Sequence, residues 1–374
     1  MPSAKKTGIL LALVMLILTP VWSQYASLEP PPEQFSDYPD RYNSLRTEQT
    51  EYTAETEVKA EPPVKRIDSY SVSLFPLFGF LIGQVEELVY ESPGSALYKS
   101  QLTWDLKPLA YFGFNVDFDP RNPFEKHGII ASTAVKIGLP FKTGIMEDVD
   151  WYMGNITDYS THDAYNMNAI LLDVSGGYSW HLGKIFTLGA NAKFSYMYFS
   201  WSAEDGSGVY DIYSMAWRDV NFSGPVVLYS QHWIIFSPGI LAKVKIGKYF
   251  TIDGNISYSP LTFCIARDDH LLRNMIFRDY SYFGHYIDGG LKLTYSLHPK
   301  IDLSLFVSYR HIMGSRGNSF FQDGGETNDT NQYANGESGA GFSALNLGLA
   351  VRISVFGGQQ GSSETPTRFL TISR

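Results

Sequence analysis

The chain has 374 residues and a formal net charge of −9 at pH 7, with 25 tyrosines, 24 phenylalanines and 33 glycines. An acidic chain argues against nucleic acid as a partner and favours a cationic one. The single cysteine, Cys264, excludes an intramolecular disulfide framework. Abundant aromatic residues and glycine, combined with modest charge, favour a β-barrel.

Residues 1–23 have the pattern of a secretory signal peptide. Lys5 and Lys6 precede an apolar stretch that ends at Trp22 and is too short and too poorly flanked for a membrane helix. We expect cleavage before Gln24. An exported chain without another candidate spanning helix is a soluble secreted or periplasmic protein, or an outer-membrane barrel.

Two further segments lack the patterns of regular structure. Residues 24–68 are rich in proline, glutamate, serine and threonine, which predicts a disordered extension on the periplasmic side. A simple spacer is one interpretation, and binding of peptidoglycan or of a partner is the other. Residues 358–374 are predicted to form a flexible tail. The barrel is therefore expected between residues 69 and 357.

From Ser69 onward, apolar and polar residues alternate. Residues 301–309 carry apolar side chains at odd positions, and residues 345–355 repeat this pattern. Alternation of this length is typical of a strand with one face in lipid and the other in a polar lumen. A soluble β-sandwich also alternates, but its strands are usually shorter.

The connections between the alternating segments are of two kinds. Short turns are expected at 181–184, 247–248 and 297–300, and long polar loops at about 141–164, 205–223, 266–281 and 311–340. Short turns at one end and long loops at the other are typical of outer-membrane barrels. We therefore predict an all-β fold, a ten-stranded antiparallel transmembrane β-barrel with long extracellular loops and both termini in the periplasm.

Two acidic clusters are expected on the same rim of this barrel. They are Asp148-Val149-Asp150 and Asp268-Asp269-His270. Paired carboxylates opposite an Asp-x-His pair are the groups needed to hold a water molecule and deprotonate it. The alternative for a bare Asp-x-Asp is an ordinary solvated loop. We interpret the combination as the site of a surface hydrolase.

Several short motifs resemble those of the omptins, the ten-stranded outer-membrane aspartyl-type proteases of bacteria. They occur in the expected order between about Ser69 and Phe356. The matching segments are Glu87-Leu88-Val89-Tyr90, Ser100-Gln101-Leu102-Thr103-Trp104, Asp148-Val149-Asp150-Trp151, Thr157-Asp158-Tyr159-Ser160-Thr161-His162, Asp268-Asp269-His270, Arg316-Gly317-Asn318-Ser319 and Gly339-Ala340-Gly341.

The resemblance implies a role for each site residue. His270 would be the general base, oriented by Asp268, while Asp148 and Asp150 would position the water from across the cleft. No metal or other cofactor is implied. The expected substrates are basic peptides or proteins, cleaved at the cell exterior by a monomer embedded in outer-membrane lipids.

The chain departs from the family pattern at three positions. The pocket for a basic side chain keeps Glu87 at one wall but has Ala266 where the family has a second acid. Tyr198 replaces an arginine, and another basic position is His232; in the family such residues bind lipopolysaccharide. The resemblance implies that activity depends on a glycolipid. This chain, however, does not match the family at these two glycolipid-binding positions.

Two smaller groups of residues have alternative interpretations. Asp158, Ser160 and His162 form either a hydrogen-bonded scaffold or a Ser–His–Asp nucleophile, and their spacing favours the scaffold. Cys264 is expected to pack at the end of the seventh strand rather than to act as a thiol.

The competing functional class is a barrel without enzymatic activity, either an adhesin or a small pore. Ten strands enclose little lumen. Inward charged residues are expected to fill it with charge pairs; the candidates are Lys193, Lys243, Asp253, Arg310 and Arg352. Convergence of the two acidic clusters would separate an enzyme from an adhesin.

Overall fold

The computed structural model describes residues 70–323 and 332–356. The expected signal peptide (1–23), the extension (24–68) and the tail (358–374) lie outside the described residues. Within the described ranges there is no helix long and apolar enough to cross a membrane.

The described residues form fourteen β-strands. In chain order they are β1 (Tyr70–Tyr90), β2 (Tyr98–Pro120), β3 (Gly128–Gly138), β4 (Lys142–Tyr152), β5 (Asn155–His181), β6 (Phe186–Tyr210), β7 (Arg218–Ile246), β8 (Phe250–Ser259), β9 (Thr262–His270), β10 (Met275–Tyr282), β11 (His285–His298), β12 (Ile301–Met313), β13 (Arg316–Asp323) and β14 (Gln332–Phe356).

The fourteen strands make ten passes along the barrel. Four passes are interrupted by two or three residues: 139–141 separate β3 from β4, 260–261 separate β8 from β9, 283–284 separate β10 from β11, and 314–315 separate β12 from β13. All pairings between neighbouring passes are antiparallel, and β1 pairs with β14 to close the sheet. This confirms the predicted ten-stranded antiparallel barrel.

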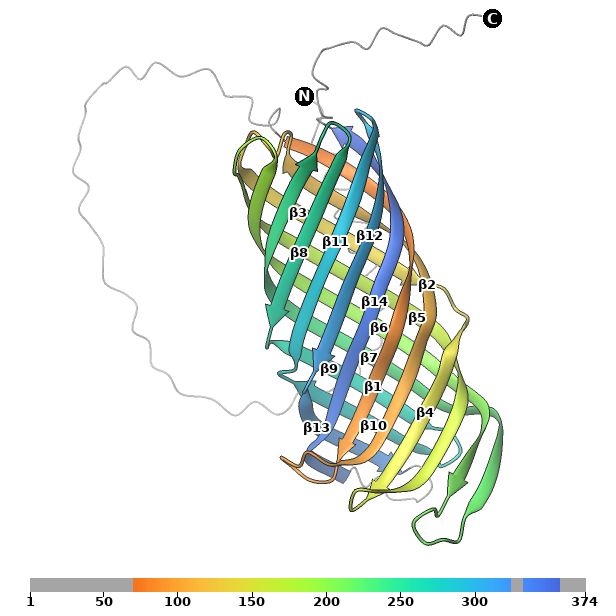
Figure 1. The fold of residues 1–374 in the computed structure, drawn as a ribbon. Coiled ribbons are helices and arrows are strands. Elements are labelled where there is room, and N and C mark those ends of the chain that lie inside the picture. Colours follow the sequence, from red (N-terminus) through yellow and green to blue (C-terminus); the bar gives the residue numbers. More distant parts are fainter. Residues whose placement is uncertain (1–69, 324–331, 357–374) are drawn as a thin grey trace, which may run out of the picture. The chain divides into compact units, whose positions relative to one another are not determined.

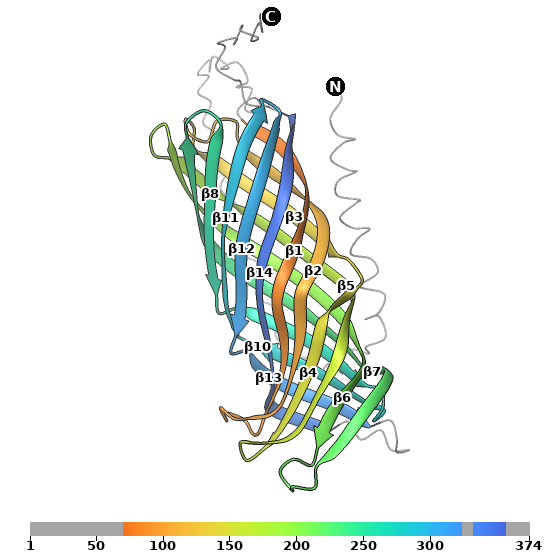
Figure 2. The same cartoon turned by 45° about the vertical axis from the view of Figure 1, so that its right-hand side comes forward.

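The interruptions divide the barrel into two stacked rings that share six long strands. The first ring is β1-β2-β3-β5-β6-β7-β8-β11-β12-β14. In the second ring β4, β9, β10 and β13 replace β3, β8, β11 and β12. Figures 1 and 2 show these four short strands together at one end of the barrel.

The outward face of the first ring is apolar. Its exposed side chains include Ile256, Leu291, Leu303, Leu305, Leu349 and Ile353, each at least 42% exposed. Ser304, between two outward leucines, is fully buried and faces inward, which confirms the predicted register of this strand. An outward apolar band of this kind matches the hydrocarbon region of a membrane.

The outward face of the second ring carries charged side chains among apolar ones. The inward positions of β9, including Ala266 and Asp268, are buried, so Arg267 and Asp269 between them point outward, where they form an ion pair with N–O distance 2.9 Å. Charged groups cannot face hydrocarbon without a large cost in free energy. The second ring therefore projects beyond the membrane-facing band.

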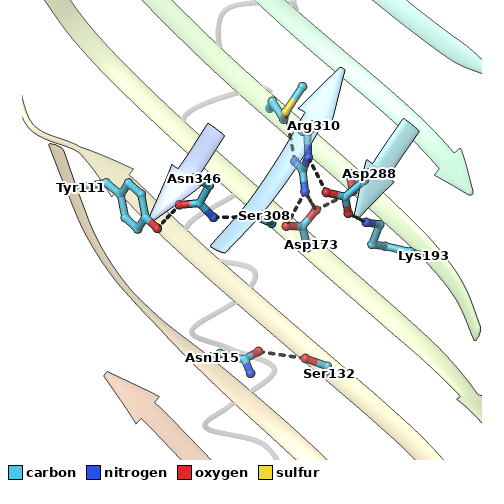
Figure 3. A network of polar contacts seen from close by, with 11 residues as sticks. Tyr111, Asn115, Ser132, Asp173, Lys193, Asp288, Ser308, Arg310 and Asn346 are labelled. Carbon is cyan, nitrogen blue, oxygen red and sulfur yellow. Dashed lines mark hydrogen bonds and ion pairs between the residues drawn. The ribbon is translucent and has the colours of Figure 1, made fainter. Parts of the chain in front are cut away.

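Charge pairs line the interior of the first ring, as the sequence predicted, but they do not fill it, because a cavity of about 370 Å³ lies among them. Lys193 pairs with Asp288, and Arg310 pairs with Asp173 at 3.1 Å. Figure 3 shows this network beside a second chain of hydrogen bonds. In that chain Tyr111 donates to Asn346, which donates to Ser308. Lys243–Asp253 and Arg352–Asp302 are further pairs.

Aromatic side chains close the interior between these charge pairs and the mouth of the second ring. Trp104 stacks on Trp201 and on Tyr229, with ring centroids 5.7 and 5.3 Å apart. Phe199 and Phe342 join this layer, and all five side chains are at most 1% exposed. The aromatic layer forms a solid floor beneath the second ring.

Three of the four stretches predicted as long loops are extended hairpins, and the fourth, 311–340, lies partly outside the described residues. Most of the polar stretches 141–164, 205–223 and 266–281 is strand, and the connections that remain are residues 153–154, 211–217 and 271–274. Outward side chains of the second ring face water rather than lipid. Polar residues therefore occupy both faces, and the apolar half of the period-two pattern disappears although the strands continue.

Candidate active site

The four predicted catalytic residues lie inside the second ring. Asp148 and Asp150 are on β4, and Asp268 and His270 are on β9; three strands, β5, β6 and β7, lie between them around the ring. Asp148 and His270 line one small cavity of about 60 Å³. A cavity of this size with polar walls has room for water. The two acidic clusters therefore converge, although more than 100 residues separate them in sequence.

Asp268 orients His270. The Oδ2 atom of Asp268 lies 2.6 Å from Nε2 of His270, and the Asp268 side chain is only 2% exposed. A carboxylate bound to Nε2–H fixes the tautomer and leaves Nδ1 able to accept a proton. Burial lowers the pKa of His270, but the charges of Asp268 and Asp148 outweigh burial, and the pKa is raised above its ordinary value. His270 is therefore a strengthened base.

Asp148 and Asp150 form the opposite wall. Burial, followed by the charge of Asp150, raises the pKa of Asp148 to about 7. Burial also raises the pKa of Asp150, while a hydrogen bond from Ser100 opposes this effect. Oδ1 of Asp148 is buried without a hydrogen-bond partner among the described residues. At neutral pH this wall can therefore accept a hydrogen bond from water or donate one.

Ser160 and His162 on β5 line the same cavity. The Ser160 hydroxyl lies 3.0 Å from Nε2 of His162, and Nδ1 of His162 contacts the backbone oxygen of Asp205. Asp158 instead accepts a hydrogen bond from the backbone N–H of Asp211 at 3.1 Å. Among the described residues no carboxylate contacts His162, so the three residues are not arranged as a Ser–His–Asp nucleophile, and their hydrogen bonds fit the scaffold interpretation.

Two features of the cavity were not predicted from the sequence. Ser160 and His162 are on a strand rather than a loop, so their spacing of two puts both side chains on its inward face, against the water-sized cavity. Arg273, in the connection 271–274, also lines the cavity. Its positive charge opposes the rise in the pKa values of Asp148, Asp150 and His270, which burial or neighbouring carboxylates cause. No pattern in the sequence pointed to this arginine.

Glu87 lies deeper in the second ring. It is on β1, opposite Leu102 on β2 and Ala340 on β14, and it is 3% exposed. Burial raises its pKa well above the ordinary value, and the charges of Asp268, Asp279 and Asp148 add to the effect. Glu87 therefore belongs to the same acidic interior as the four predicted catalytic residues.

Tyr198 and His232 lie together on the outward face of β6 and β7. The Tyr198 ring stacks on the His232 ring with centroids 4.5 Å apart, and the Tyr196 hydroxyl lies 2.8 Å from Nδ1 of His232. The position where the family pattern has an arginine is thus part of an aromatic cluster. Cys264 is buried on the inward face of β9 and is a free thiol.

Comparison with known proteins agrees with this architecture. The model of the omptin family matches residues 68–354. The crystal structure of the outer-membrane protease OmpT from Escherichia coli is similar with a TM-score of 0.68 at 19% identity, covering 76% of this chain and 96% of that chain. No curated protein matches the sequence.

Other barrels are far less similar. A mutant of the monoaromatic hydrocarbon channel TodX has a TM-score of 0.26 and a Pseudomonas aeruginosa FadL homologue one of 0.22, both at 6% identity; each comparison covers 76% of this chain and 90% of the other. TM-scores this low are not evidence about the fold of this chain. The family match spans the whole two-ring barrel, so the chain belongs to the omptin family and has the fold of an outer-membrane protease.

Proposed function

We propose that the protein is an endopeptidase of the bacterial outer membrane that cleaves cationic peptides or proteins at the cell surface. The observation that carries the proposal is the single cavity shared by Asp148 and His270, with Asp268 2.6 Å from His270. A water molecule in that cavity would contact a base on one side and a carboxyl group on the other.

The proposed reaction uses this water as the nucleophile. Nδ1 of His270 accepts a proton from the water while its oxygen attacks the carbonyl carbon of the peptide bond, and Asp268 stabilises the imidazolium that forms. Asp148 and Asp150 hold the water through hydrogen bonds. The C–N bond then breaks, and the proton passes from His270 to the leaving amine. The reaction is proposed to need no metal ion or other cofactor.

The charge of the site supports a basic substrate. Glu87, Asp148, Asp150 and Asp268 are all inside the second ring, and the whole chain has a net charge of −9. Such a field attracts Lys and Arg side chains and repels anions. The substrate class is thus proposed from the electrostatics of the site and from the family resemblance together.

The proposed exterior position follows from the two rings. The described chain begins and ends in the first ring, at Tyr70 and Phe356, which pair through β1 and β14 near the same end. Outer-membrane barrels keep short turns in the periplasm and extend on the outside. The second ring, which carries the charged pair Arg267–Asp269 on its outward face, is therefore proposed to stand above the membrane on the cell exterior.

A pore is the weaker candidate. The aromatic layer of Trp104, Trp201 and Tyr229 closes the interior between the second ring and the cavity of the first ring. An adhesin would need no buried Asp–His pair facing a second pair of carboxylates across a cavity. The arrangement therefore favours the enzyme over both alternatives.

Cleavage by the purified protein tests the proposal. The folded barrel in detergent is incubated with a quenched fluorescent peptide that contains arginine and with a matched peptide that contains glutamate instead, each with and without EDTA. We expect cleavage of the arginine peptide only, unchanged by EDTA. Inhibition by EDTA would point to a metal, and a folded barrel that cleaves neither peptide would support an adhesin.

A further inference from the structure

A buried carboxylate in the second ring has no role in the reaction described above. Asp279 is on β10, directly opposite Ala266 on β9, and its other neighbour is Ser319 on β13. Its side chain points inward and is 4% exposed. It thus lies on the strand next to the position where the family pattern has an acid and this chain has an alanine.

Asp279 and Glu87 belong to one interior group. The charge of Asp279 acts on Glu87: the pKa of Glu87 is raised by burial first and then by Asp268 and Asp279. Burial raises the pKa of Asp279 to about 7, a Ser319 hydrogen bond opposes the shift, and Asp268 adds to it. Two buried carboxylates that repel each other favour a cation between them.

Both carboxylates have an unused oxygen. Oε2 of Glu87 and Oδ1 of Asp279 are buried and have no hydrogen-bond partner among the described residues. Within this part of the chain neither group takes part in an ion pair closer than 4.0 Å. Buried polar atoms are normally satisfied, so two orphaned oxygens on inward carboxylates indicate a ligand that supplies the missing donors.

The surroundings suit a planar cation. Tyr229, opposite Asp268 on the neighbouring strand β7, is buried against Trp104; burial raises the pKa of its hydroxyl well above the ordinary value, and the charge of Glu87 adds to the effect. Ala266 is small and leaves the space in front of Asp279 free of a larger side chain on β9. A guanidinium group can stack on an aromatic ring while it donates hydrogen bonds in the ring plane to carboxylates.

We propose that Asp279 and Glu87 together bind the basic side chain of the substrate, with Asp279 supplying from β10 the carboxylate that Ala266 does not supply from β9. The inference rests on the proposed peptidase function and assigns the specificity of that site. From the sequence alone, Glu87 was the only carboxylate expected in this pocket, whereas the proposed pocket has two. Arginine fits best, because its guanidinium can reach both carboxylates.

A charge comparison tests the assignment. Two quenched peptides are used that differ only in arginine or citrulline at the residue before the cleaved bond; citrulline keeps the shape but is neutral. We expect the folded parent protein to prefer arginine in kcat/KM by at least about 100-fold, in line with a site whose buried polar groups need their partner. Asp279→Asn should reduce this preference by about tenfold or more, through loss of arginine cleavage.

The control and the rescue separate charge from fold. Asp163→Asn removes the same charge at an exposed ion pair with Lys142 and should keep the preference. Ala266→Asp combined with Asp279→Ser moves the carboxylate across the β9–β10 pair and should restore it. If Asp279→Asn does not fold, the double variant still tests the inference. A folded double variant that does not prefer arginine would contradict it.

The outcomes also separate this inference from the proposed function. An Asp279→Asn protein that folds and keeps the parent's arginine-to-citrulline ratio overturns the role of Asp279 and leaves the peptidase intact. A parent protein that cleaves both peptides equally overturns the pocket as a whole. A folded parent that cleaves neither peptide overturns the proposed function instead.

Discussion

The Asp268 carboxylate lies 2.6 Å from Nε2 of His270, at the inner wall of a ring whose opposite wall carries Asp148. This relationship gives the barrel a base with a fixed tautomer, held on a rigid strand. The neighbouring strands β7 and β10 pair along the whole of β9 and keep the two residues in place. The proposed chemistry therefore depends on the second ring, which extends the barrel beyond its apolar band.

The first prediction concerns the role of Asp268 as a positioning residue. Asp268→Asn keeps the size of the side chain but removes the charge that raises the pKa of His270. We expect kcat to fall by about 10³–10⁴-fold. The acidic limb of the pH–rate profile should move to lower pH, which a merely structural role would not cause. An unchanged profile in a folded variant would contradict the assignment.

The second prediction concerns the opposite wall. Asp148→Asn should lower kcat by about 10²–10⁴-fold, because the carboxylate that holds the water is lost while the cavity remains. The matched control is Glu147→Gln at the adjacent residue of β4, whose carboxylate accepts a hydrogen bond from Tyr159 at 3.3 Å. Equal activity of the two variants would show that Asp148 is not part of the catalytic site.

The third prediction links stability to pH. Asp279 has a pKa of about 7 in the folded protein and about 3.9 when unfolded, so between these values the folded state binds more protons. The contribution of Asp279 to stability is present below pH 4 and is lost as pH rises to 7. The temperature at which the barrel loses its compact gel mobility should therefore fall with pH. Asp279→Asn should reduce this fall, and an identical pH dependence would contradict the buried charge.

The fourth prediction concerns the membrane-facing register. Leu305→Arg should destabilise the barrel by about 2–4 kcal/mol, because Leu305 is 55% exposed on the apolar band. Ser304→Ala, at the neighbouring inward position, should be much milder, since it leaves only the Thr294 hydroxyl without its partner. Urea titrations of both variants in lipid vesicles measure the difference, and equal losses would exclude the register.

The sequence was sufficient for the parts of the fold that face lipid. The alternation around Leu305 and Leu349 exists because hydrocarbon excludes polar side chains, so the strand period is visible without a structure. The same reasoning failed above the membrane, where Arg267 and Asp269 face water and give a polar stretch that resembles a loop. The prediction of ten passes was correct, but the described polar stretches expected as loops are mostly strand.

The site was predictable only in part. Asp148, Asp150, Asp268 and His270 occur in short motifs, so the residue types could be recognised before their positions were known. Asp279 could not be found in this way, because its position opposite Ala266 depends on the register of the β9–β10 hairpin. The length of the connection 271–274 sets that register, and a single aspartate in a polar stretch carries no signal of its own.

The central claim is that His270 and the carboxylates around it cleave basic peptides at the cell exterior. Intact cells that display the parent protein or His270→Ala at equal, gel-verified levels of folded barrel are incubated with an arginine-containing fluorogenic peptide that does not cross the membrane. We expect rapid cleavage by the parent and a loss of about 10³-fold or more in His270→Ala, because the base and the held water act as one unit. Near-normal cleavage by folded His270→Ala, or cleavage by the parent only after the cells are opened, would contradict the account.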